Sequence, residues 1–235
     1  DVYVSPYKST NHGTISGATY VNGVGSPVAQ SAVMDWNKGT NLLVYSEQFN
    51  NTSGWSTTNA SIAANDTTAP DGQTTAEEVT FASSSGEVRG QLINVANETH
   101  IASCWFKNGT IDQIFFEVIG GTPDILGQAT INLSTGTLSD QVGSFTPTIE
   151  AYADGWYRVA VGDLGNASVA SPSVKIKQSG GNTGTFYVWG AQVEASDSLG
   201  AYIPNHTGTP ITTPVLLPQG LTSGRDITGV NLFEN

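Results

Sequence analysis

Few side chains in this sequence have the type and spacing that catalysis requires. The histidines His12, His100 and His206 are scattered, and none has the neighbours of a triad or a metalloprotease motif. Glu77 and Glu78 are adjacent, and adjacent strand residues point to opposite faces, so they cannot flank a glycosidic bond as a glycosidase pair does. We therefore predict that the protein is not an enzyme.

Two single residues could still carry chemistry. Glu117 is the best placed acid, on an apolar strand predicted to be central, but the alternation of that strand favours a solvent-facing side chain over a catalytic one. Cys104 lies in an apolar run with no cation nearby to lower its pKa, so a buried, inert thiol is expected. A single cysteine also excludes an internal disulfide framework.

The sequence contains more residues suited to binding a sugar than residues suited to catalysis. A sugar-binding face needs flat aromatic rings and planar polar groups, and strand alternation places Arg89 with Gln91, and Phe115 with Glu117, on one face of their strands. Trp105 lies on the strand between them in sequence. If these three strands are neighbours with coincident faces, the five residues form a candidate glycan-binding patch. The alternative is that Trp105 and Phe115 belong to the core, because a register slip of one residue reverses each face.

The elements that would position these side chains are strands. Short runs rich in β-branched and aromatic residues recur between turn signals, with no helical period between them, which predicts an all-β antiparallel jelly-roll sandwich. Two runs, 101–107 and 114–119, are the most apolar and are expected to be central, whereas 174–177 alternates apolar and charged residues as an edge strand does. The other predicted strands are 42–45, 60–64, 75–81, 88–95, 128–133, 137–142, 149–152 and 156–161.

A closing strand begins at Thr185 and leaves the domain through Tyr202-Ile203-Pro204. We expect it to lie beside residues 41–55, far upstream in the sequence. Strict alternation would put Tyr187, Trp189, Ala191 and Val193 on one face, which is a core pattern.

The predicted domain organisation is an extended N-terminal arm at 1–40, the sandwich at 41–204 and a Pro-rich C-terminal arm or linker at 205–235. Only Ala29–Trp36 could turn helical, and the prolines after 204 exclude pairing in a central strand. Arms without a core of their own are ordered only when docked on neighbours, so we expect a homo-oligomer, with a trimer as one candidate.

Charge excludes two classes of partner. Against 20 Asp and Glu there are 8 Lys and Arg, a formal net charge of −12, which repels nucleic acid and anionic membranes. The apolar runs are too short for membrane insertion. We expect neither kind of binding.

Five segments in order, NLLVYSEQFNNTSGW, TAPDGQTTAEEVTF, INLSTGTL, ADGWYRVAV and FYVWGAQVEASDSLGAYIPNHTGTPIT, resemble a module found in bacteriophage tail and head-fibre proteins. The resemblance covers residues 41 to about 212. It implies a fold similar to jelly-roll carbohydrate-binding modules, and a structural protein of the extracellular virion, with other virion proteins as partners and adhesion to a host surface glycan as a candidate role. A capsid decoration or cement protein that binds only virion proteins is the first alternative, and a polysaccharide depolymerase is the second.

The same resemblance implies a structural calcium ion where the first and last strands of the module meet. Glu47 and Glu194 would lie near it, since carboxylates suit a hard cation. Two solvated acids beside loops are the competing interpretation.

Overall fold

The computed structural model describes residues 40–92, 99–120, 125–162 and 173–211 with their side chains. Outside these ranges it describes only the backbone of strand residues at 13–14, 19–20, 28–29, 33–39, 163 and 212–219. The chain divides into two compact units, one of Thr40–Thr212 and one of Asp1–Gly39 with Thr213–Asn235.

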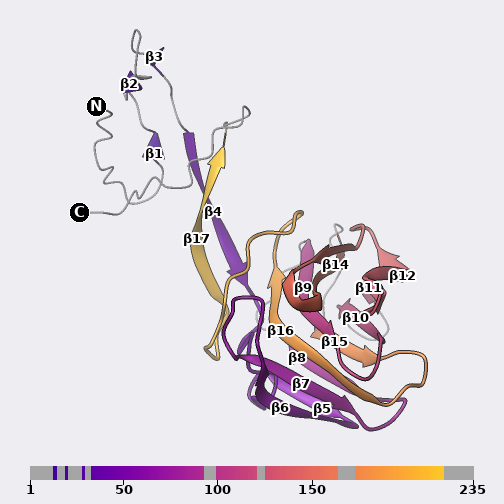
Figure 1. The fold of residues 1–235 in the computed structure, drawn as a ribbon. Coiled ribbons are helices and arrows are strands. Elements are labelled where there is room, and N and C mark those ends of the chain that lie inside the picture. The colour runs from indigo at the N-terminus through magenta and orange to yellow at the C-terminus, as the bar shows by residue number, and fades with distance from the viewer. Residues whose placement is uncertain are drawn as a thin grey trace. The chain divides into compact units, whose positions relative to one another are not determined.

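The unit Thr40–Thr212 is an all-β antiparallel sandwich of two six-stranded sheets, which confirms the predicted fold class (Figure 1). The first, here called the β10 sheet, has the order β12 (Thr137–Gly143), β11 (Ile125–Asn132), β10 (Gln113–Ile119), β15 (Ser173–Gln178), β8 (Glu87–Gln91), β5 (Trp55–Thr58). The second, the β9 sheet, has the order β13 (Thr148–Ala151), β14 (Trp156–Asp163), β9 (His100–Asn108), β16 (Gly184–Glu194), β7 (Ala76–Phe81), β6 (Ala60–Thr67). A single 3-10 turn, η1 (Ala153–Gly155), joins β13 to β14.

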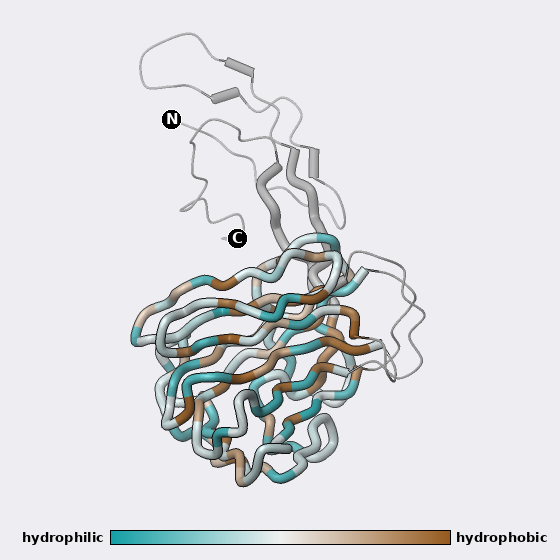
Figure 2. The backbone as a smooth tube through the Cα atoms, turned by 90° about the vertical axis from the view of Figure 1, so that its right-hand side faces the viewer, coloured by the Kyte–Doolittle hydropathy of each residue, from teal (hydrophilic) through white to brown (hydrophobic). Residues whose placement is uncertain are grey.

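The core lies between the two sheets and follows from period-two alternation (Figure 2). Phe116 of the β10 sheet meets Phe106 of the β9 sheet edge to face, with ring centroids 5.2 Å apart. Cys104 is fully buried beside them, and burial raises the pKa of its thiol, as expected for an inert core residue. Both central strands, β9 and β10, are flanked on each side by other strands, as their composition predicted.

Two predictions about strands in this unit are wrong. The run 174–177, predicted at an edge, is β15, an interior strand between β10 and β8. Its alternation reflects one face in the core and one face outward, a pattern that interior and edge strands share. The run 42–45 is not a strand; only the single bridge between Leu43 and Leu92 forms there.

Segment 41–49 lies beside the closing segment, as predicted. The Asn41 amide donates to the carbonyls of Ala191 and Ile203 at 3.0 and 2.9 Å, and Ser46 N–H donates to Asn205 O at 2.7 Å. Buried amide side chains thus satisfy the backbone where the ladder has ended.

The second compact unit contains strands only, among its described residues. A three-stranded sheet has the order β1 (Gly13–Thr14), β4 (Val33–Asn41), β17 (Ile211–Gln219), and β2 (Thr19–Tyr20) pairs with β3 (Val28–Ala29). The helix suggested for Ala29–Trp36 is therefore wrong, since β3 and β4 occupy its described residues. Pro214 and Pro218 lie in β17 at the edge of its sheet, where a missing N–H is tolerated.

No helix in the part of the chain described here is long and apolar enough to cross a membrane.

Candidate functional site

The outward face of the β10 sheet, here called the polar face, carries one continuous row of polar side chains. Arg89 lies opposite Lys175, which lies opposite Glu117, and directly opposed residues of an antiparallel ladder share a face. The row extends to Gln128 on β11 and to Ser56 on β5. Four adjacent strand pairs therefore bring these side chains together, although the residues are far apart in sequence.

A second row beside the first holds Glu87, Lys177 and Phe115, and two ion pairs join the two rows. Lys175 Nζ lies 3.0 Å from a carboxylate oxygen of Glu87, and Lys177 Nζ lies 3.4 Å from the Glu117 carboxylate. The Lys177 ammonium also lies 5.9 Å from the centre of the half-buried Phe115 ring. Each lysine reaches diagonally to the acid of the other row, so the two acids and two lysines neutralise each other.

A depression of about 290 Å³ opens at the β5 edge of the polar face. Its wall combines the turn that precedes β5 with the ends of β5 and β8. The lining residues are Thr52, Ser53, Gly54, Trp55, Ser56, Arg89 and Gln91. None is acidic, and hydroxyl, amide and guanidinium groups supply its polar atoms.

Arg89 lines this depression and has no partner among the described residues. No residue in the described ranges forms a hydrogen bond or an ion pair with its guanidinium, and Arg89, whose neighbours across the ladder are Ser56 and Lys175, is half-buried. The turn around it is fixed from below, because Trp55 packs into the core, donates from Nε1 to Tyr45 O at 3.0 Å and contacts the Phe49 ring. The site therefore has a wall anchored in the core through Trp55, and one cation without a partner among the described residues.

The structure brings together four of the five predicted glycan-binding residues. Arg89, Gln91, Phe115 and Glu117 share the polar face, although β15 separates their strands. Trp105 is the exception, because β9 belongs to the opposite sheet and not between β8 and β10. The chain crosses from one sheet to the other between consecutive strands, which sequence order does not reveal.

Trp105 instead packs on the outward face of the β9 sheet. Its ring meets Trp189 and Tyr202 at 5.2 and 5.1 Å, the Arg158 guanidinium lies 4.5 Å above it, and only 4% of the residue is exposed. With Trp156 these rings form a second apolar cluster. In this environment Trp105 is a packing residue, which is the alternative to a role in glycan binding.

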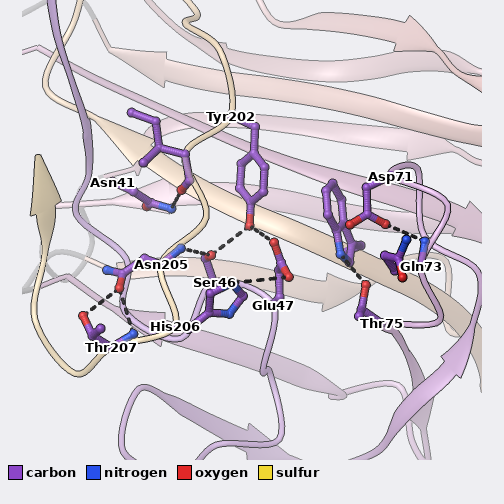
Figure 3. Close-up of polar contacts among 12 residues, drawn as sticks. Asn41, Ser46, Glu47, Asp71, Gln73, Thr75, Tyr202, Asn205, His206 and Thr207 are labelled. Atoms are coloured by element: carbon purple, nitrogen blue, oxygen red, sulfur yellow. Dashed lines mark hydrogen bonds and ion pairs between the residues drawn. The ribbon is translucent and has the colours of Figure 1, made fainter. Parts of the chain in front are cut away.

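Glu47 belongs to a polar network that binds the closing segment (Figure 3). Tyr202 Oη donates to Glu47 at 3.0 Å and lies 2.8 Å from Ser46 Oγ, and His206 Nε2 lies 3.9 Å from the same carboxylate. Burial raises the pKa of Glu47, and the Tyr202 hydrogen bond opposes that shift. This carboxylate holds the exit segment against the entry segment.

Glu194 has different partners. It accepts a hydrogen bond from Gly200 N–H at 3.0 Å, and burial raises its pKa. No contact joins it to Glu47, and no three His, Cys, Asp or Glu side chains in the described ranges could hold a metal ion together. The calcium ion stays a prediction that no such cluster in this part of the chain supports.

A second depression, of about 360 Å³, contains a buried acid that we did not predict as functional. Its wall includes Glu77 with amide side chains such as Asn50 and Asn65. Burial raises the pKa of Glu77 to about 7, although Asn50 N–H donates to its carboxylate at 3.1 Å. The signal was present, since Glu77 alternates with the core residues Val79 and Phe81.

The polar face also contains residues that sequence reasoning did not select. Lys175 and Lys177 were assigned to an edge strand, and Ser56 to no strand at all. Knowing that β15 lies between β8 and β10 would have placed both lysines in the patch.

No protein-family model matches the chain, and no curated protein matches its sequence. Among solved structures, the enzymatically active domain of tailspike protein 4 from bacteriophage CBA120 aligns at 12% identity and a TM-score of 0.42, over 65% of this chain and 21% of that one. An arabinose-bound α-L-arabinofuranosidase aligns at 14% identity and a TM-score of 0.43, over 66% of this chain and 26% of that one. This chain thus spans about a fifth to a quarter of the length of either protein.

Proposed function

We propose that this protein is a non-enzymatic glycan-binding structural component of a bacteriophage particle, and that it binds sugar on the polar face. The observation that carries this proposal is the pair of polar rows on the β10 sheet, with a depression at its β5 edge. Planar amide and guanidinium groups there match sugar hydroxyls, and the half-buried Phe115 ring offers an apolar surface beside them.

The proposal includes no catalytic role because of the way in which the acids of the polar face are paired. Glu87 and Glu117 are each ion-paired with a lysine, and an interior strand separates them. A glycosidase holds two carboxylates on opposite sides of one glycosidic bond. The ion pairs of Glu87 and Glu117 instead tie both acids to lysines of β15, so the proposal gives them a structural role.

The assignment to a phage particle rests on the sequence resemblance of residues 41–212 to modules of tail and head-fibre proteins. The strands outside the sandwich, β1 to β4 and β17, form only small sheets among their described residues. Such arms fit a protein that assembles with other virion proteins or with copies of itself.

A glycan array probed with the purified full chain tests the binding function. Ser56→Trp fills the depression from an exposed position on the edge strand β5, and we expect it to lower glycan affinity at least about tenfold, because it removes the space that a sugar ring requires. Ser61→Trp, on the exposed edge strand β6 of the other sheet, is the matched control and should bind as the wild type does.

Two results would contradict the proposal. A chain that binds no glycan, but does bind other proteins of the particle, is a decoration or cement protein. Release of new reducing ends from a bound polysaccharide would show a depolymerase.

A further inference from the structure

The positive charge of the sandwich is concentrated on the polar face. Between residues 40 and 212 the sequence has five Lys and Arg against 16 Asp and Glu. Three of the five, Arg89, Lys175 and Lys177, lie on this face. Such clustering in an acidic chain marks a place where negative charge is accommodated.

Only one of the three cations is available to a ligand. Lys175 and Lys177 are ion-paired with Glu87 and Glu117. Arg89 has no such partner in the described part of the chain, and no acid lines the depression that it borders. The depression therefore carries a local charge of one unit, presented by a guanidinium.

A guanidinium matches a carboxylate better than it matches any neutral group of a sugar. Its parallel N–H groups donate two hydrogen bonds to the two oxygens of one carboxylate, and the pair is stronger than a neutral hydrogen bond. The hydroxyls of Thr52, Ser53 and Ser56 and the amide of Gln91 surround this point and can bind ring hydroxyls. A volume of about 290 Å³ lies at the low end for small-ligand sites, which suits one sugar ring.

We propose that the depression selects a sugar unit that carries a carboxylate, such as a uronic or sialic acid, and that Arg89 binds that carboxylate. This inference rests on the proposed glycan-binding function and names the ligand class of the same site. Lys175 and Lys177 keep Glu87 and Glu117 neutralised, so that the two acids do not repel the ligand.

The test begins with the full chain on an array of carboxylated, sulfated and neutral glycans. The strongest carboxylated glycan is then titrated calorimetrically against its methyl ester. We expect the ester, and Arg89→Gln with the free acid, each to weaken binding about 10- to 100-fold, since each removes a charge-assisted hydrogen-bond pair. Arg89→Lys should recover only part of this loss, because an ammonium lacks the paired donors.

Lys107→Gln is the matched control, since it removes one positive charge from β9 in the other sheet. It should leave affinity unchanged, and all variants should keep the wild-type melting temperature. Higher salt should weaken binding of the free acid and leave binding of the ester unaffected.

The outcomes separate this inference from the function on which it rests. Preference for neutral or sulfated glycans, lost in Ser56→Trp but unchanged in Arg89→Gln, overturns the carboxylate assignment and leaves the polar face as the binding site. Binding that neither substitution affects, or no glycan binding at all, overturns the proposed function as well.

Discussion

Among the described carboxyl groups, that of Glu77 has the pKa that burial raises most. It lies on the inward side of β7 at the end of the core, and burial raises the pKa of its carboxyl group to about 7. The unfolded chain releases that proton near the ordinary pKa of 4.5. The contribution of Glu77 to the stability of the folded state is therefore fully present below pH 4.5, and it is lost as the pH rises through 7.

Glu77→Gln should flatten this dependence. The amide oxygen can still accept from Asn50 N–H, and glutamine has no charge to bury. Between pH 5 and pH 8 the free energy of unfolding of the wild type should fall by about 1–3 kcal/mol more than that of the variant. Urea titrations at both pH values measure the difference. Parallel losses in the two proteins would show that Glu77 does not titrate in this range.

At the scale of elements, the bulge in β16 decides which side chains meet. The register with β9 shifts between Trp189 and Gln192, and Gly190 has a φ of +64°. Trp189 therefore packs on the outward cluster, while Ala191 and Val193 belong to the main core. Our prediction that Trp189 shares a face with those two residues is wrong because strict alternation does not survive a bulge.

Gly190→Ala should be strongly destabilising. A Cβ there would lie 2.9 Å from a ring carbon of Trp105, and the positive φ adds strain. We expect a loss of about 2–4 kcal/mol in the free energy of unfolding. Gly155→Ala is the control, because it has a φ of +77° but nothing within 4 Å, and it should lose only about 1 kcal/mol. Equal losses in thermal unfolding would mean that backbone strain alone acts.

The pattern of residues was sufficient to predict most strands and the hairpin turns, since alternation and turn chemistry are local. The Asn132 side chain accepts from Ser134 N–H and Thr135 N–H, which fixes the turn between the predicted strands 128–133 and 137–142. The order of strands in each sheet was not accessible, because it depends on which sheet each strand joins. Without that order, the prediction wrongly included Trp105 in the glycan-binding patch and left out Lys175 and Lys177.

At the scale of the whole molecule, the closing segment is part of the sandwich. Asn205 is fully buried, its amide donates to Leu43 O at 2.8 Å, and its N–H donates to Ser46 Oγ at 2.8 Å. Residues far beyond the last strand of the β9 sheet therefore complete the fold at its entry point.

A fragment of residues 40–212 should fold alone, with a melting temperature within about 5 °C of the full chain. A fragment that stops at 201 should lose about 3 kcal/mol or more, because the Asn41 and Ser46 groups that bind the closing segment would lack partners. Calorimetry of both fragments measures this. A 201 fragment as stable as the longer one would show that the closing segment is dispensable.

The hydrogen bond from Asn41 to Ile203 O holds the two ends of the sandwich close together. The chain enters and leaves the sandwich at neighbouring points, and β4 and β17 continue as paired strands of one sheet. A domain with adjacent ends can be spliced into a surface loop of an unrelated carrier without stretching that loop. Residues 40–212 are thus suited to transplantation as an internal cassette, and the host protein would keep its own continuous fold on either side of the graft.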